Sequence, residues 1–292
     1  MTPEQANILC RLVFDACALF LWGAHGFVWL AVPKKLSAGI AQHLARFYQP
    51  ALWLLAIAGT GKIVAQSAIL GDGWQSITPS LMIDLLEATQ SGRAFGLQAG
   101  LALVLVLGYY TLPRHRGPVV TLLGAPLLMS LSLSGHAVAQ EDLTGLLHRA
   151  NHSLHLLSAS LWLGALPPVL LLLRAMPDAR TRTPALTGLM RFSTIGHVAV
   201  ALTLVSGMLN VWLITGLSLD MVAPYQQWLA LKIAAVAAMV AIAIVNRYVF
   251  VPRLHRNPVQ ALRAIRIGTL AECALGLIAV ALVSAFGTMQ PG

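Results

Sequence analysis

Three histidines occur at helical spacing in one short stretch of this 292-residue chain. His148, His152 and His155 follow one another at intervals of four and three residues, and about 100° of rotation per residue places them within a stripe of roughly 60° on one helix face. Imidazole nitrogens on successive turns can share a divalent metal ion at distances near ~2.0 Å. The spacing therefore predicts a metal site, for which copper, zinc, iron and nickel are equally suitable.

Two further candidate ligands precede this stripe. His136 stands at the end of an apolar run, and the connection from it to His148 is short, so we expect it beside the stripe at the same depth. Met129 precedes His136 by seven residues on the same predicted helix face, and its thioether would suit Cu(I). A lone histidine or methionine at such a position more often has a structural role. The convergence of four histidines is what favours a metal or cofactor site.

Other ionisable side chains also lie inside apolar runs, where a charge is costly unless it is paired or faces a cavity. An ion pair between Asp15 and either Lys62 or Lys232 would only fix helix packing, and His197 bonded to a neighbouring carbonyl would be structural as well. The functional alternative is a pathway or relay. Its candidate residues are Asp15, Lys62 and Lys232 at the depth of the stripe, and His25, His197 and Glu272 near the other face.

Membrane-spanning helices must position all of these groups. Hydrophobic residues make up 58% of the chain and charged residues only 10%, whereas soluble domains carry roughly 25% charged residues. A span needs about 20 apolar residues, and it must be helical because lipid offers no hydrogen-bond partner to the backbone. We predict an all-α, polytopic bundle of about eight transmembrane helices. The apolar runs fall at 7–33, 46–70, 94–114, 117–140, 146–174, 188–216, 226–249 and 264–288.

The basic residues give this bundle an orientation. The formal net charge is +9, yet the lysines and arginines lie between apolar runs and form no patch of the kind that binds nucleic acid. Most of them follow the first, third, fifth and seventh runs, whereas the alternate loops are acidic. Because lysine and arginine accumulate in cytoplasmic loops, we expect both termini outside the cytoplasm. Membrane lipid is therefore an expected partner, and nucleic acid is not.

Enzymatic chemistry has little support in the sequence. The segment His148-Arg-Ala-Asn-His152 lacks the glutamate that an HExxH metalloprotease uses as general base, and no Gly-x-Ser-x-Gly elbow or phosphate-binding glycine-rich loop is present. The three cysteines lie in apolar runs without a CxxC pair. We expect no enzyme activity and a single transmembrane domain over 1–292.

Several short motifs, in order and spacing, resemble the copper resistance protein D family (CopD/PcoD). Its members carry Ser-Gly-His-Ala and then His-Leu-Leu-Ala-Ala-x-x-Trp-x-Gly-Gly-Leu; this chain has Ser-Gly-His-Ala at 134–137 and a similar segment from His155 through Trp162 to Gly164. Ala165 replaces the second glycine. The likeness is clearest over 120–288. Further motif residues are Arg191, Phe192, Ser193, Ser206, Gly207, Asn210, Tyr225, Lys232, Asn246, Arg247, Arg266 and Glu272.

This resemblance implies a copper homeostasis protein of the bacterial inner membrane, multi-pass, with periplasmic N- and C-termini. It would bind copper at the periplasmic face and move it toward the cytoplasm, with a periplasmic copper chaperone as a candidate partner. His136 and His155 correspond to motif histidines of the family. Ligand roles for His148 and His152 rest on their geometry alone.

The sequence is also compatible with two functions other than copper transport. Histidines on facing transmembrane helices also suit bis-imidazole haem ligation, so a membrane b-type haem protein in electron transfer is one alternative. A copper sensor or a scaffold for a periplasmic chaperone is the other, because it needs the same external metal site. A Soret band in the visible spectrum would identify the haem protein.

Overall fold

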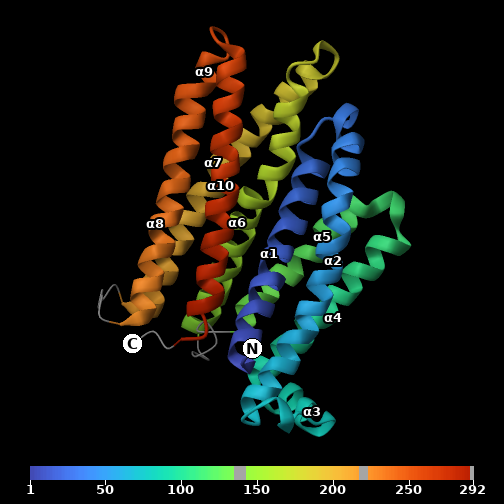
Figure 1. The fold of residues 1–292 in the computed structure, drawn as a ribbon, viewed down its shortest axis with the longest axis vertical. Coiled ribbons are helices and arrows are strands. Elements are labelled where there is room, and N and C mark those ends of the chain that lie inside the picture. The colour runs from blue at the N-terminus through green and yellow to red at the C-terminus, as the bar shows by residue number, and fades with distance from the viewer. Residues whose placement is uncertain (135–142, 217–222, 290–292) are drawn as a thin grey trace.

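Long helices run side by side through most of the molecule in the computed structural model (Figure 1). The structure describes residues 1–134, 143–216 and 223–289, and within these ranges no strand is present. The elements in chain order are α1 (Pro3–Leu30), α2 (Lys34–Leu70), η1 (Trp74–Ser76), α3 (Pro79–Ala88), α4 (Gln90–Thr111), η2 (Pro113–His115), α5 (Arg116–Ser130), η3 (Leu131–Leu133), α6 (Leu143–Ala175), α7 (Ala179–Thr215), α8 (Pro224–Val245), η5 (Asn246–Phe250), α9 (Val251–Arg253) and α10 (Pro258–Phe286).

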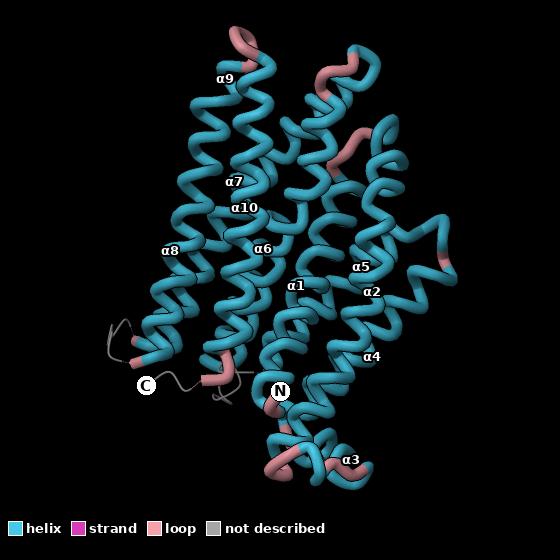
Figure 2. Tube along the Cα trace, in the orientation of Figure 1, coloured by secondary structure: helices cyan, strands magenta, loops and turns pink. Residues whose placement is uncertain are grey.

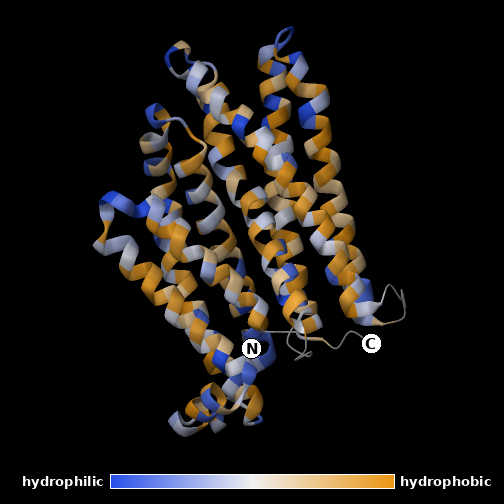
Figure 3. Ribbon diagram, turned by 180° about the vertical axis from the view of Figure 1, so that it is seen from behind, coloured by the Kyte–Doolittle hydropathy of each residue, from blue (hydrophilic) through white to orange (hydrophobic). Residues whose placement is uncertain are grey.

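Eight of the described helical segments are long and apolar enough to cross a membrane, which confirms the predicted fold class and number of spans. η2, α5 and η3 together form the fourth segment, Pro113–Leu133, and α8 with η5 and α9 forms the seventh, Pro224–Arg253. The predicted span 117–140 runs beyond this fourth segment, and its last residues lie outside the described ranges. Hydrophilic residues concentrate at the two ends of the bundle and hydrophobic residues along its length (Figure 3).

The start of α1, the end of α10 and α3 lie at one end of the bundle, which we call the terminal end (Figures 1 and 2). The connections from α1 to α2, from α6 to α7 and from α9 to α10 lie at the opposite end. This arrangement follows from an even number of spans. Three of the four basic connections that follow the predicted spans therefore lie together at the opposite end.

A crossing of α1 and α6 joins the first four spanning segments to the last four. A Cβ atom added to Gly23 would lie 1.9 Å from the carbonyl oxygen of Ser160, and one added to Gly164 would lie 2.7 Å from the Gly23 Cα. The Ser160 hydroxyl donates to the Leu19 carbonyl at 2.7 Å. Small residues thus bring the two backbones into direct contact, as is typical of helix pairs in membranes.

The seventh segment contains one turn that is not an α-helix. α8 ends at Val245, and η5 continues it as a π-helix before α9 begins. Pro252, the second residue of α9, has no N–H to donate to the carbonyl four residues earlier, so a regular α-helix would be disrupted here. Asn246 is the first residue of this π-turn and is buried.

Candidate functional site

α6 carries the three predicted histidine ligands in its first four turns, at the terminal end. His148 is buried, with 3% of its surface exposed, and His152 and His155 are half-buried. The predicted stripe therefore exists as a helix face that packs into the bundle. Because α6 is continuous from Leu143 to Ala175, the spacing of the three side chains is that of a regular helix.

The three imidazoles do not form a metal site by themselves. His148 and His155 are seven residues apart, which corresponds to about 10 Å along the helix axis and is too far for one ion. Among the described residues, no group of three or more histidine, cysteine, aspartate or glutamate side chains is placed to hold a metal. His136 lies in 135–142, outside the described residues. The four-histidine site therefore stays a prediction.

The imidazole of His155 is oriented by α7. Its Nδ1 lies 3.1 Å from the Thr203 carbonyl oxygen and 3.1 Å from the Ser206 hydroxyl. The carbonyl can only accept, so we assign the proton to Nδ1, which leaves the Nε2 lone pair available. Histidines that bind metals almost always donate their other ring N–H in this way. The absence of a side chain at Gly207 leaves room for the ring, because a Cβ there would lie 3.1 Å from the His155 Cε1.

A ladder of buried polar side chains runs between α6 and α7, and we call it the α6–α7 ladder. At the terminal end, the Asn151 amide donates to the Ser206 carbonyl at 2.9 Å and to Asn210 Oδ1 at 2.8 Å. His155 follows, and then the Thr203 hydroxyl donates to the Ser158 hydroxyl at 3.1 Å. Sequence reasoning missed Asn151, Ser158 and Thr203. Their three- and four-residue spacing from His155 and Ser206 was the available signal.

Positive charges flank the histidines. Lys232 of α8 interacts electrostatically with His152 and His155, and Arg11 of α1 interacts with His152. Lys232 was a predicted pathway residue, and its charge lies near enough to act on both of these histidines. Arg11 was not predicted from the sequence, because an arginine near the start of a span is usually an interfacial side chain.

Lys62 and Asp15 form a second buried polar group near the terminal end. The Lys62 ammonium donates to Gln98 Oε1 and lies 4.1 Å from the centroid of the Phe14 ring. Asp15 interacts electrostatically with Lys62. The Gln98 amide donates in turn to the Ser130 carbonyl at 3.0 Å. This cluster therefore ties α2 to α4 and α5 and satisfies a buried charge.

Met129 is 46% exposed, whereas its neighbour Ser130 is 3% exposed. The side chain that reaches α6 from this region is Ser132, whose hydroxyl accepts from the Ser153 hydroxyl at 3.0 Å. α5 ends at Ser130 and the chain continues as the 3₁₀-helix η3. A 3₁₀-turn rotates the chain more per residue than an α-turn, so an α-helical extrapolation from Met129 toward His136 does not hold.

The three residues predicted near the other face lie in different environments. His25 is 5% exposed, bonds the Leu21 carbonyl through Nδ1 at 3.0 Å and stacks on the Tyr48 ring. His197 is exposed and bonds Ser193 of its own helix and the Tyr248 hydroxyl. Each imidazole thus bonds a carbonyl four residues earlier, which is a structural role. Glu272 is 4% exposed and interacts with other elements, described below.

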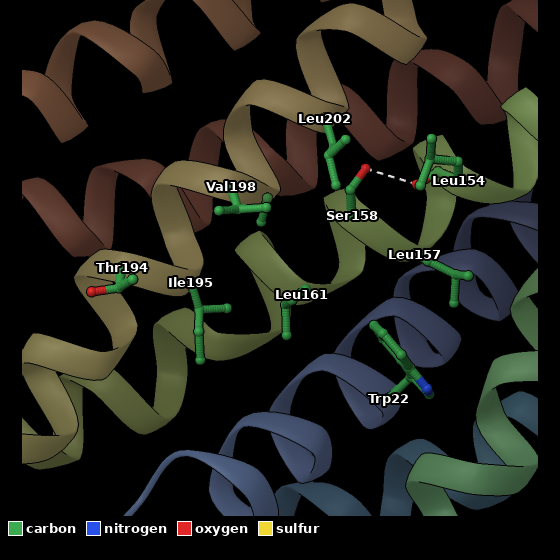
Figure 4. Close-up of a pocket in the computed structure, with 10 residues that line it drawn as sticks. Trp22, Leu154, Leu157, Ser158, Leu161, Thr194, Ile195, Val198 and Leu202 are labelled. Carbon is green, nitrogen blue, oxygen red and sulfur yellow. Dashed lines mark hydrogen bonds between the residues drawn. The ribbon is translucent and has the colours of Figure 1, made fainter.

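An apolar pocket of about 360 Å³ opens between α1, α6 and α7 (Figure 4). Trp22, Leu157 and Leu161 line one side of it and Ile195, Val198 and Leu202 line the other. The Ser158 hydroxyl at its edge is already bonded to the Leu154 carbonyl (Figure 4). The lining offers no metal ligand, so this pocket is separate from the histidine stripe.

Comparison with known proteins covers nearly the whole chain. Residues 1–146 match the family described as copper resistance protein D-like, N-terminal domain, and residues 187–286 match copper resistance protein D. The intervening residues include most of α6. No solved structure matches the chain.

Three relatives are similar over long stretches. The inner membrane protein YebZ of Escherichia coli is 35% identical over 265 residues, or 90% of each chain. Copper resistance protein D of Pseudomonas syringae pv. tomato is 28% identical over 305 residues, which cover 99% of this chain and 97% of the relative. Copper transport protein CutJ of Bacillus subtilis is 29% identical over 216 residues, which cover 68% of this chain and 38% of the relative.

Proposed function

The chain belongs to the copper resistance protein D family, and from this premise we propose that it binds copper at its periplasmic face and moves it toward the cytoplasm. Its eight apolar helices and its similarity to an inner membrane protein support a multi-pass location in the inner membrane. Relatives named for copper resistance and copper transport support copper as the cargo. Copper is therefore the proposed substrate, which binds transiently, and not a resident cofactor.

The observation that carries the proposal is the orientation of His155. Its Nδ1 is held by the Thr203 carbonyl and the Ser206 hydroxyl, which leaves Nε2 as a lone-pair donor inside the bundle. A neutral imidazole fixed in this way is a good ligand for copper. We propose that copper binds at successive positions along this stripe, formed by His155, His152 and His148 together with His136, because one ion cannot reach all four. Met129 is 46% exposed and is the least suitable member of the predicted set.

The distribution of charge supports a periplasmic location for this site. The histidines lie at the terminal end, and the connections at the opposite end carry most of the basic residues. Lysine and arginine near the ends of spans favour the cytoplasmic side. With that orientation, copper would arrive from the periplasm at the histidines, and both termini would be periplasmic.

Polar groups deeper in the bundle are the proposed route inward. Lys232, Asp15 and Lys62 lie near the histidine end, and the α6–α7 ladder extends from His155 toward the middle of the membrane. Glu272 lies further along the same direction. His25 and His197 are candidates with weaker support, because each is bonded to its own helix.

The decisive experiment measures copper binding and copper accumulation together. The double variant His136→Ala/His155→Ala should lose high-affinity copper binding in the purified protein and copper accumulation in cells that express it. His255→Ala, which changes an exposed histidine in the connection from α9 to α10 at the opposite end, is the matched control and should behave as the wild type. Accumulation that is unchanged in the double variant would refute transport through this site.

Copper K-edge absorption of the purified protein would test the ligand type. Nitrogen scattering from imidazole is expected. A sulfur-dominated first shell would contradict the histidine site. Copper uptake into proteoliposomes distinguishes a transporter from a sensor or chaperone scaffold, because only a transporter moves copper without another protein.

A haem function gains no support from the histidine positions. Bis-imidazole ligation requires histidines that face each other from two helices. In the part of the chain that the structure describes, the clustered histidines all come from α6. Of the remaining described histidines, His25 and His197 bond their own helices.

A further inference from the structure

Glu272 lies midway along α10 and is almost completely buried, with 4% of its surface exposed. Its Oε1 accepts a hydrogen bond from the Asn246 amide at 3.1 Å, and the Trp162 indole N–H also donates to the carboxyl group. Trp162 and Asn246 are themselves buried. Both donors are neutral, so neither supplies the positive charge that would balance a carboxylate in the middle of a membrane.

Three local features of the fold place these groups together. Asn246 is the first residue of the π-helix η5. Gly268 lies beside it on α10, where an added Cβ would come within 2.5 Å of Asn246 Oδ1. α6 presents Trp162 from a third direction. π-turns inside α-helices occur frequently at functional sites, and here an amide at the start of the turn bonds a buried carboxyl group.

The charged side chains of α8 and α1 near the terminal end of the bundle interact with groups other than Glu272. Lys232 of α8 interacts with the histidines, and Arg11 of α1 donates to the Gly287 carbonyl beyond the end of α10. On α10 itself, Cys273 interacts electrostatically with Glu272. From α6 and η5 the facing groups are Trp162 and Asn246, which do not titrate. The described residues therefore surround Glu272 with neutral groups.

The donor set favours a proton over copper as the occupant. Cu(I) prefers thiolate, thioether or imidazole ligands, and Cu(II) prefers several nitrogen and oxygen ligands. No metal-binding group of three or more suitable side chains occurs at Glu272 among the described residues. A carboxyl oxygen that accepts from an amide and an indole can bind one proton without any further ligand.

A polar route leads toward this carboxyl group from the histidine end. The α6–α7 ladder ends with the Thr203 and Ser158 hydroxyls. Trp162 follows Ser158 by four residues, so it lies one turn further along the same face of α6. The hydroxyls and the indole thus form a succession of groups between His155 and Glu272.

We propose that Glu272 is a proton-binding site in the middle of the membrane, and that its proton is exchanged as copper moves. The exchange rests on the proposed copper function, whereas proton binding itself does not. The carboxylate gains a proton at one oxygen and becomes neutral, and no other bond changes. A copper ion in the ladder repels that proton, because two positive charges in a low-dielectric interior disfavour each other.

Infrared spectroscopy of the protein in lipid tests proton binding directly. A protonated carboxyl group has a carbonyl stretching band that a carboxylate lacks. We expect a band that disappears as the pH is raised and is absent in Glu272→Gln. Glu87→Gln, which changes an exposed glutamate in α3, is the control and should retain it. A band that does not respond to pH, or that persists in Glu272→Gln, would overturn the proposal.

Trp162→Phe provides a second variant if Glu272→Gln fails to fold. It removes the indole N–H and keeps an aromatic ring. The band should persist but shift to higher frequency, because the carboxyl group loses one donor. An unshifted band would show that Trp162 does not bond the titrating group, which contradicts the proposed site.

Copper uptake into proteoliposomes tests the exchange. An imposed pH gradient should change the wild-type rate severalfold and leave Glu272→Gln unaffected. A wild-type uptake rate that does not change with the pH gradient would refute the proton exchange but not the copper function. Absence of wild-type uptake would refute the copper function, and the infrared titration would still decide whether Glu272 binds a proton.

Discussion

The Lys62 side chain is only 2% exposed, so its ammonium charge is buried. Such a charge is tolerated only if neighbouring groups stabilise it. Gln98 accepts from it, and the rings of Phe14 and Phe95 lie 4.1 Å and 5.0 Å from the nitrogen. Cation–π contacts of this kind are worth more when they are desolvated. The lysine is therefore held by one amide oxygen, two aromatic faces and the nearby carboxylate of Asp15.

Removal of Gln98 should be harmful mainly because it leaves this charge without its acceptor. We expect Gln98→Leu to lower the free energy of unfolding by about 1.5–3 kcal/mol, as for hydrogen bonds to charged groups. Lys62→Met in the same chain should recover most of that loss. Chemical denaturation of the single and double variants in detergent measures the coupling. Simple additivity of the two changes would show that the pair does not interact.

Ser206 shares the Nδ1 of His155 with the Thr203 carbonyl, so its hydroxyl helps to fix the ring. Ser206→Ala should weaken copper binding roughly tenfold, in the range found for groups that orient a metal-binding histidine. Ser67→Ala is the matched control, because Ser67 is also buried but bonds only its own helix in α2. Titration with copper under fixed buffer conditions gives the comparison. Equal affinities for the two variants would contradict the orientation argument.

At the scale of elements, the contact between α1 and α6 depends on glycine. The Cβ of Gly23→Ala would meet backbone atoms of Ser160, which cannot move without displacing the helix. We expect this variant to lose about 3 kcal/mol of stability, the upper end of the usual range for overpacking. Gly100→Ala should instead stabilise α4 by about 0.5–1 kcal/mol, because nothing lies within 4 Å of the added atom. Thermal unfolding of the two variants should therefore shift in opposite directions.

The spans could be predicted from sequence because each of them must present a long run of apolar residues to lipid. Helix ends could not be predicted in the same way. α2 begins at Lys34 and α7 at Ala179, well before the predicted runs at 46 and 188, since their first turns extend beyond the apolar segment and carry polar residues. The η3 turn after Ser130 likewise has no hydropathy signal.

The candidate site was predictable in part for a related reason. Helical spacing fixes which residues share a face of α6, so the histidine stripe follows from sequence. Spacing says nothing about what the neighbouring helix presents to that face. The Thr203 carbonyl that orients His155 is a backbone group, which every residue carries, and therefore leaves no trace in the sequence.

At the scale of the whole molecule, the bundle has two chemically different ends. The terminal end carries the α6 histidines, the start of α1, the end of α10 and α3, and the opposite end carries most of the basic loops. Charge differences of this kind orient membrane proteins during insertion. The expected result is a bundle with its histidines facing the periplasm.

Cysteine labelling in intact cells tests this orientation. In a variant without Cys10, Cys17 and Cys273, we expect Asp72→Cys at the terminal end to react with a membrane-impermeant maleimide. Lys35→Cys at the opposite end should react only after the cells are permeabilised; both positions are exposed. The reverse pattern would place the histidines in the cytoplasm and reverse the proposed direction of copper movement.

The glycine crossing of α1 and α6 has a mechanical consequence. Gly23 and Gly164 bring the backbones of α1 and α6 into direct contact at one level, and His148 lies sixteen residues from Gly164, or about 24 Å along α6. A rotation of about 5° around that level would displace the histidine end by roughly 2 Å, a length comparable to a metal–nitrogen bond. A small rotation at the crossing would thus be enough to move the α6 histidines relative to the first four spans.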